Sequence, residues 1–246
     1  MKKSLLMAVA STILSTSAFA AIAQPLSTEQ TQQIEGVIQS YFQKNPGVVM
    51  QALEAAMAAQ QVEELAKLQK AVRANKDKLF SDKRSPTAGN PKGTQTLVVF
   101  MDPYCGYCHK FHAELDKLLA TNKDLKVVFK DIAIMSEKSD IAIRAMLAAK
   151  NQGKYKEFQD VLFTSKTKMS EDTLLATAGT LGMDVKKFGD DMKSEAIVKF
   201  VADTKQLSSD MGVNGTPTIV IGDKVHPGYL SAEDLTTLLK QSQKAN

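Results

Sequence analysis

The sequence predicts an α/β fold preceded by a helical arm, and two observations carry this prediction. Apolar strands at 97–101 and 125–130 flank a helix that starts near Cys105, a pattern typical of a right-handed βαβ unit with parallel strands. A stretch with only helical periodicity, about 136–209, then separates this unit from two further strands and a last helix. We therefore expect a parallel strand pair, an inserted group of helices and a closing ββα unit.

Residues 1–20 have the three parts of a secretory signal peptide. A basic pair precedes an interrupted apolar core at 5–14, and Ala-Phe-Ala at 18–20 supplies the small-x-small cleavage pattern. Ser and Thr interrupt the core, whereas a membrane span needs about 20 continuous apolar residues. We expect cleavage and a soluble protein exported to the periplasm, where disulfide bonds form and persist.

Composition excludes several classes of protein. The 246 residues are 43% hydrophobic and 24% charged, which is typical of a globular chain. The net charge is +4, or +2 without residues 1–20, and the charges are interspersed, so nucleic-acid binding is not expected. Two cysteines are too few for a disulfide-stapled scaffold or a Cys-only zinc site.

The segment 24–80 is expected to be a helical arm. Ser27 and Gln30 form a capping box at the first helix, and Pro46 occupies the first position of the second. Such an arm cannot bury its apolar stripe alone, so it packs against its own domain or pairs with another copy. The polar stretch 81–96 is expected to be a linker to the cysteine domain, 97–246, and it favours pairing into a homodimer or homotrimer.

The closing unit is expected to be a hairpin and a helix. Its strands fall at 218–221 and 224–229, on either side of Gly222-Asp223. The last helix is expected from about Ser231.

Cys105 and Cys108 form a C-x-x-C motif with several possible meanings. Zinc would need two more ligands, and only His109, His112 and His226 remain. A structural disulfide across four residues closes almost no loop and so stabilises little. With His109 the motif also matches covalent haem attachment, but the apolar strand that leads directly into it does not suit a haem pocket. A redox pair explains the surroundings better, and we expect neither a metal nor a cofactor.

The redox interpretation assigns different chemistry to the two sulfurs. Cys105, at a helix N-terminus, faces unpaired N–H groups and the positive end of the dipole, which favour the nucleophilic thiolate. Cys108, one turn later, can attack a mixed disulfide on Cys105 and release the partner. Gly106 and Tyr107 tune the thiolate, and His109 either adds positive charge or is simply a solvated helix residue.

Gly215-Thr216-Pro217-Thr218 is a second motif far along the chain. A proline that opens a strand suits an edge position, and by base rate its peptide bond would be trans.

The two motifs together resemble thioredoxin-fold disulfide proteins of the bacterial periplasm. The resemblance covers about 85–240 and rests on DPYCGYC at a helix start and on the ending GTPTIVIGDKVHPGYLSAEDL. The long helical stretch, which includes GKYKEF at 153–158, resembles the inserted helical domain of the DsbA family. The N-terminal arm is similar to those of a subgroup with the ScsC proteins, in which such arms assemble dimers or trimers.

The resemblance implies roles for individual residues. Cys105 is the attacking thiol and Cys108 the resolving one, and Pro217 is cis and packs against the pair. Thr216 offers backbone groups to an extended substrate peptide.

The sequence departs from the family pattern at two places. Val99 stands where many relatives carry an acidic residue, so Asp102 or water would accept the Cys108 proton. The segment 132–134 lacks a proline common there, which leaves the start of the helical insert less defined.

The direction of electron transfer stays open between two related activities. The inserted helices resemble DsbA, an oxidase, whereas the Gly-Tyr dipeptide, the Thr before Pro217 and the arm resemble DsbC, an isomerase. Joined copies hold a misbridged client at raised effective concentration, which favours isomerase activity. Expected partners are exported proteins with cysteines and a DsbD-like or DsbB-like membrane protein. A chaperone-like protein and a copper-binding protein that uses the same cysteines are the remaining alternatives.

Overall fold

The computed structural model describes residues 26–164 and 169–244. The chain forms two compact units, Met1–Ala58 and Ala59–Asn246. The predicted signal peptide, 1–20, lies outside the described residues.

The first unit contains helix α1 (Thr28–Lys44) and the start of α2 (Pro46–Ala74). The predicted capping box is present, because the Ser27 hydroxyl accepts from the Gln30 amide and the Gln30 side chain accepts from the Ser27 amide. Pro46 begins α2, as predicted. No residue of α1 is buried in the described chain, and apart from the edge-to-face contact of Tyr41 with Phe42 its apolar side chains are left largely exposed. The large apolar side chains exposed in this unit are Leu26, Ile34, Val37, Ile38, Tyr41, Phe42, Val48, Val49, Met50, Leu53 and Met57.

The second unit is built on a five-stranded mixed sheet. Its strands are β1 (Thr87–Gly89), β2 (Gln95–Met101), β3 (Leu125–Asp131), β4 (Thr218–Ile221) and β5 (Lys224–Pro227), in the order β1-β3-β2-β4-β5. β2 and β3 are parallel, which confirms the predicted βαβ unit, and the other pairs are antiparallel. Gly222 has φ of 60° in the two-residue turn of the predicted hairpin, a conformation that favours glycine.

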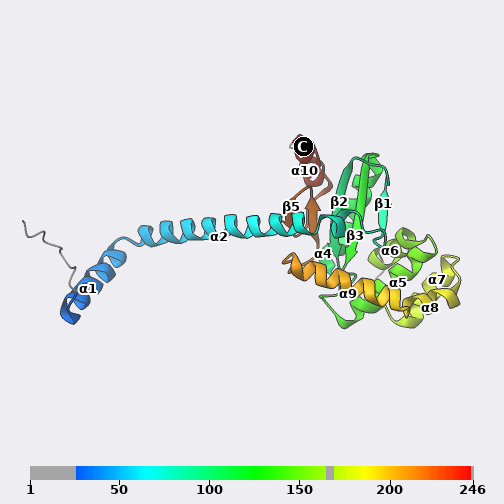
Figure 1. Cartoon of the computed structure of the whole chain (residues 1–246), viewed down its shortest axis with the longest axis horizontal. Coiled ribbons are helices and arrows are strands. Elements are labelled where there is room, and N and C mark those ends of the chain that lie inside the picture. Colours follow the sequence, from blue (N-terminus) through cyan, green and yellow to red (C-terminus); the bar gives the residue numbers. More distant parts are fainter. Residues whose placement is uncertain (1–25, 165–168, 245–246) are drawn as a thin grey trace, which may run out of the picture. The chain divides into compact units, whose positions relative to one another are not determined.

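Ten helices or helix segments accompany this sheet or precede it within the described residues, and five of them form the insert. These five are α5 (Glu137–Asn151), α6 (Tyr155–Thr164), α7 (Glu171–Thr180), α8 (Val185–Met192) and α9 (Glu195–Asp210). α5 packs against each of the other four, and its buried small side chains let them approach closely: Ala142, Ala145, Ala148 and Ala149. Figure 1 shows these helices gathered beyond one end of the sheet, as the predicted insert at about 136–209 requires.

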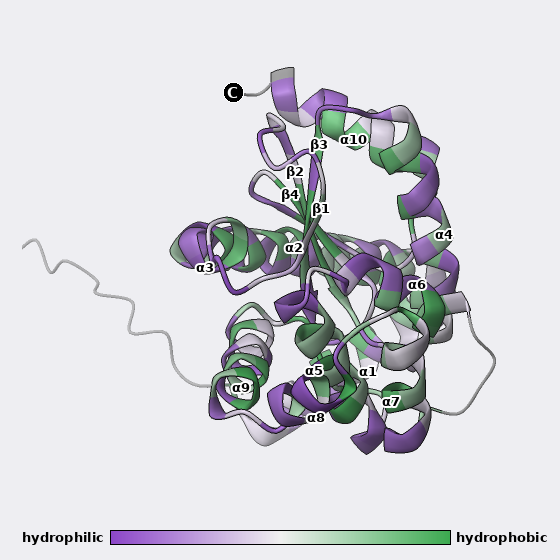
Figure 2. Ribbon diagram, turned by 90° about the vertical axis from the view of Figure 1, so that its right-hand side faces the viewer, coloured by the Kyte–Doolittle hydropathy of each residue, from purple (hydrophilic) through white to green (hydrophobic). Residues whose placement is uncertain are grey.

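The sheet separates two apolar cores. Leu97, Val99 and Met101 of β2 face the core that contains α4 (Gly106–Thr121), α10 (Ala232–Lys244) and the inserted helices. The alternate residues Val98 and Phe100 face a smaller core, which is closed by the end of α2, by α3 (Lys76–Phe80) and by the end of α9. Figure 2 shows α3 on one side of the sheet and α4 and α10 on the other.

The junction between the arm and the cysteine domain differs from the expected helical arm to 80 and linker at 81–96. Val72 and Leu79 are buried in the smaller core, and residues 87–89 form strand β1 against β3. The buried Lys130 ammonium donates to the Lys78 carbonyl at 2.5 Å and to the Ser85 hydroxyl at 2.6 Å. Burial lowers the pKa of Lys130 to about 8. The segment 81–96 is held against the domain by polar contacts. Its lack of apolar residues therefore led to the wrong prediction of a linker.

Leu79→Ala tests whether α3 belongs to the folded domain. Leu79 is completely buried. Its truncation should lower the free energy of unfolding by about 2–5 kcal/mol in urea titrations, because it leaves a cavity in the smaller core. The matched change Val185→Ala, at an exposed position of α8, should cost less than about 0.5 kcal/mol. Equal costs for the two variants would contradict the assignment.

Candidate active site

Cys105 is the N-cap residue of α4. Its extended backbone, with φ −85° and ψ 114°, lets the side chain turn back over the first turn of the helix. The Cys108 amide donates to the Cys105 sulfur at 3.3 Å. A negative charge on this sulfur therefore meets a donor and the positive end of the helix dipole, as the sequence predicts.

Cys108 lies one turn into α4 and is completely buried. Burial raises the pKa of its thiol far above the ordinary value, and the neighbouring Asp102 backbone and Thr216 side chain lower it by less. Both cysteines are free thiols in this structure. The pair therefore combines an outer sulfur at a helix end with an inner sulfur that resists ionisation.

The Gly215–Thr218 motif lies directly against the cysteines. The Cys105 thiol donates to the Thr216 carbonyl at 3.1 Å, although the two residues are 111 positions apart. The Thr216–Pro217 peptide bond is cis, as the family resemblance implies. Thr216 is half-buried and Pro217 is buried at the start of β4. The structure thus brings together four of the predicted site residues; substrate binding by Thr216 and Pro217 stays a prediction.

The residues between and after the cysteines face different surroundings. Gly106 is exposed, and a Cβ built on it would meet no atom within 4 Å. Tyr107 is 63% exposed, and the Lys110 ammonium lies 5.3 Å from its ring centroid. His109 is half-buried, with Nε2 2.7 Å from the Pro103 carbonyl and its ring against Phe163. His109 is therefore tied to the protein and is not a freely solvated helix residue.

Asp102 joins the cysteine turn to the helical insert. Its buried carboxylate accepts hydrogen bonds from the Tyr104 amide at 2.8 Å and from the Ser139 hydroxyl at 2.7 Å. It also accepts from the amides of Ile134 and Met135, both at 2.9 Å. With these donors in place the carboxylate is occupied, so its suggested service as the proton acceptor for Cys108 finds no support in the geometry.

A second buried carboxyl, Asp131, ends the neighbouring strand β3. Burial raises its pKa to about 7; a hydrogen bond from Tyr155 opposes this effect and the nearby Asp102 adds to it. The Tyr155 hydroxyl donates to Asp131 at 2.5 Å, and the Gln159 amide donates to that hydroxyl at 3.1 Å. The other Asp131 oxygen, Oδ1, has no hydrogen-bond partner within the described residues. Asp131 is therefore a buried acid that changes charge near neutral pH.

His112 has the geometry of a metal ligand but a different role in this structure. Its Nε2 lies 2.8 Å from Asp160 and 3.6 Å from Asp116. Within the described residues, this is the one group of three or more His, Cys, Asp or Glu side chains close enough together to hold a metal ion. Lys156 already supplies a cation there, with its ammonium 2.7 Å from Asp116 and also bonded to Asp160. Burial lowers the pKa of His112, which favours the neutral ring. We interpret the group as a link between α4 and α6.

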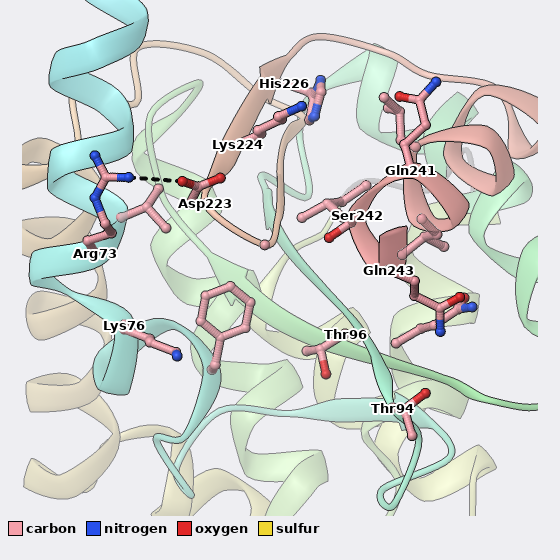
Figure 3. A pocket seen from close by; sticks show the side chains of 17 residues that line it. Arg73, Lys76, Thr94, Thr96, Asp223, Lys224, His226, Gln241, Ser242 and Gln243 are labelled. Carbon is pink, nitrogen blue, oxygen red and sulfur yellow. Dashed lines mark hydrogen bonds and ion pairs between the residues drawn. The ribbon is translucent and has the colours of Figure 1, made fainter. Parts of the chain in front are cut away.

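A separate cavity of about 640 Å³ lies at the opposite end of β2 and β4 (Figure 3). Arg73 pairs with Asp223 at 2.9 Å at its edge, and Lys76, Lys224 and His226 also line it. None of the predicted site residues lines this cavity. It is therefore distinct from the cysteine site.

Sequence reasoning recognised the two buried carboxyl groups beside the cysteines only in part. Asp102 was considered only as a proton acceptor, and Asp131 was not considered. One signal was present: the apolar runs at 97–101 and 125–130 are parallel strands, and each is followed closely by an aspartate. Because the carboxyl ends of parallel strands meet at one edge, both carboxyls belong near the cysteine turn.

Residues 96–240 match the model of the DSBA-like thioredoxin domain. The match covers more than half of the chain, and the chain therefore belongs to this family.

Curated relatives share part of their length with this chain. The Na(+)/H(+) antiporter NhaA of Herminiimonas arsenicoxydans is 30% identical over 150 residues, which are 61% of this chain and 24% of that protein. The thiol:disulfide interchange protein DsbC of Salmonella typhimurium is 26% identical over 155 residues, 63% of this chain and 54% of that protein. The chain spans about a quarter of the antiporter and about half of DsbC. No helix in the described part of the chain is long and apolar enough to cross a membrane.

Solved structures show the same fold. A thioredoxin-like oxidoreductase from Silicibacter pomeroyi is 34% identical, with a TM-score of 0.67 over 70% of this chain and 99% of that one. ScsC from Proteus mirabilis is 24% identical, with a TM-score of 0.66 over 90% of this chain and 100% of that one. The similarity to ScsC shows the fold alone, and it covers more of this chain than the similarity to the S. pomeroyi protein.

The two cysteines should differ in reactivity. In the reduced protein at neutral pH, iodoacetamide should alkylate Cys105 at least about tenfold faster than Cys108, because burial suppresses the Cys108 thiolate. Mass spectrometry of the Cys105→Ser and Cys108→Ser variants gives each rate separately. Equal rates in the two folded variants would contradict the assignment of an outer and an inner sulfur.

Asp131 should make stability depend on pH. An unfolded Asp titrates near pH 3.9, so only the native state keeps this proton between about pH 4 and the folded pKa of about 7. The stability from this proton is complete below about pH 4 and is lost as pH rises through about 7. Asp131→Asn resembles the protonated acid and does not titrate. The difference in free energy of unfolding between this variant and the native protein should therefore grow in favour of the variant by about 2–3 kcal/mol from pH 5 to pH 8, measured by urea unfolding. Parallel pH profiles would exclude this titration.

Proposed function

We propose that this protein is a periplasmic thiol-disulfide oxidoreductase that forms and rearranges disulfide bonds in exported proteins, with isomerase activity favoured. The observation that carries the proposal is the contact of the Cys105 thiol with the Thr216 carbonyl beside Pro217. It places a nucleophilic sulfur at a helix N-terminus next to a loop that can receive an extended peptide. Membership of the DSBA-like family, and similarity to the thiol:disulfide interchange protein DsbC and to the oxidoreductase from S. pomeroyi, support it.

The first step is attack of the Cys105 thiolate on a client disulfide. A bond forms between the Cys105 sulfur and one client sulfur, and the other client sulfur leaves as a thiolate. The helix dipole and the Cys108 amide stabilise the attacking charge. In this role Thr216 and Pro217 would align the client backbone, and the exposed ring of Tyr107 offers it an apolar contact.

The second step decides between two outcomes. In isomerisation, the client thiolate attacks another client sulfur, and a client thiolate finally displaces Cys105, so no electrons are transferred overall. In reduction, Cys108 loses its proton and attacks Cys105, which leaves the pair oxidised and the client reduced. The raised pKa of Cys108 slows this escape and gives the client time to rearrange.

The exposed arm supports assembly with a second copy of this chain. Ile34, Val37, Ile38 and Tyr41 follow the i, i+3, i+4, i+7 spacing of one helical face, and all four are exposed. A stripe of this kind is complementary to its own copy, so a homodimer or homotrimer is the proposed state. Joined copies would present several Cys105 thiols to one client.

The cellular setting follows from the sequence. The signal-like segment at 1–20 supports export to the periplasm. An isomerase needs its pair kept reduced, so a DsbD-like membrane partner is proposed; a DsbB-like partner would suit an oxidase.

A dithiol oxidase of the DsbA type is the second candidate function. The inserted helices α5–α9 and the family model favour it. An oxidase donates its disulfide and leaves, so it gains nothing from an oligomeric arm.

Refolding of a test protein with scrambled disulfides distinguishes the two candidates. In a glutathione buffer, catalytic amounts of the full chain should restore the activity of the scrambled protein, and Cys105→Ser should remove this effect because it lacks the attacking sulfur. A chain that oxidises the reduced test protein but leaves the scrambled one unchanged would be an oxidase.

A variant of the arm tests whether assembly is needed for isomerase activity. Ile38→Glu places a charge in the exposed stripe, and sedimentation should then show a smaller species. Isomerase activity should fall by about tenfold, while exchange with a small disulfide stays unchanged. Full isomerase activity in a monomeric variant would contradict the role of the arm.

A further inference from the structure

Asp102 is a completely buried carboxyl group whose partners in the described chain are all neutral. All four of its hydrogen-bond donors are neutral groups: three backbone amides and the Ser139 hydroxyl. Within the described residues, no Lys, Arg or His forms an ion pair with it. A buried carboxylate with such partners is expensive to maintain, which points to a role beyond packing.

We propose that Asp102 is a positioning residue for the exchange reaction and that its charge sets the cysteine pair toward the reducing side. This inference rests on the proposed exchange function and deepens it. It concerns the equilibrium between dithiol and disulfide, which is separate from the recognition of any client.

Asp102 holds residues on both sides of the cysteine turn. The Asp102 carboxylate holds the Tyr104 amide, and the Asp102 carbonyl accepts from the Cys105 amide at 3.0 Å. The same carboxylate holds Ile134 and Met135, whose side chains are exposed. One residue therefore fixes the start of the cysteine turn and the apolar loop that leads into α5.

The Asp102 carboxylate and the Cys105 thiolate carry charges of the same sign. Reduced Cys105 reacts as a thiolate. The Asp102 carbonyl holds the Cys105 amide at 3.0 Å, so a negative charge on the Asp102 carboxylate lies in the same turn and disfavours that second negative charge. The disulfide form carries no such charge and is not penalised. Asp102 therefore destabilises the reduced pair relative to the disulfide, which makes the pair a weaker oxidant. A weak oxidant suits the isomerase activity proposed above.

The equilibrium with glutathione measures this effect directly. The dithiol of Cys105 and Cys108 reacts with one glutathione disulfide to give the protein disulfide and two molecules of reduced glutathione. The glutathione S–S bond breaks, the Cys105–Cys108 bond forms, and two electrons and two protons pass from the protein to glutathione.

Asp102→Asn removes the charge with little change of shape. The equilibrium constant for oxidation of the pair by glutathione disulfide should fall by about tenfold, because the reduced form is no longer penalised. Ser139→Ala is the matched control: it removes one donor to the same carboxylate and keeps the charge, so its constant should stay within about twofold of the native value. Asp102→Glu keeps the charge and should restore most of the native constant.

Each outcome bears on the inference. An unchanged constant in folded Asp102→Asn, or an equal fall in Ser139→Ala, would overturn it. If Asp102→Asn does not fold, Asp102→Ser carries the same expectation, because its hydroxyl still accepts from Tyr104 and leaves room for water at the loop amides. A native pair that does not equilibrate with glutathione at all would instead remove the proposed exchange function.

Discussion

The antiparallel pairing of β2 with β4 is the constraint on which the site depends. β2 ends just before the cysteine turn, and β4 begins just after the cis peptide bond, so antiparallel register places both at one edge of the sheet. Phe100 pairs with Thr218 at that edge. The hydrogen bond between Cys105 and Thr216 then spans a short distance in space and 111 positions in sequence. The inserted helices lie between these strands in the chain and leave their pairing intact.

The parallel pairing of β2 with β3 places two carboxyl groups at the site. Met101 lies opposite Asp131, and Asp102 follows directly, so two carboxyls meet beneath one helix start. Their surroundings separate them: Asp102 has four donors, whereas Asp131 has one tyrosine hydroxyl. The two adjacent acids therefore differ in the number of donors that would stabilise a negative charge, and Asp131, with the fewer donors, has its pKa raised to about 7 by burial.

Much of this architecture was predictable from the sequence because its signals are local. The capping box at Ser27, the apolar strands and the C-x-x-C at a helix start are each read within a few residues. Strand β1 was not predictable, because Thr-Ala-Gly is held mainly by backbone pairing with β3, and only the small Ala88 side chain packs against the core. The same holds for Lys130, whose partners lie 45 and 52 positions earlier. For the site, the cysteines and Pro217 follow from motifs. By contrast, three of the four donors to Asp102 lie 32 to 37 positions away, in the loop before α5 and in the first turn of α5, where the sequence has no clear pattern.

The open space around Gly106 has an evolutionary consequence. The backbone there does not require glycine, and a side chain would point into solvent without displacing a neighbour. Selection can therefore exchange the two residues between the cysteines without repacking the domain. The two exposed positions between the cysteines are therefore independent of the packing of the sheet, whereas Asp102 belongs to the site and to the fold at once.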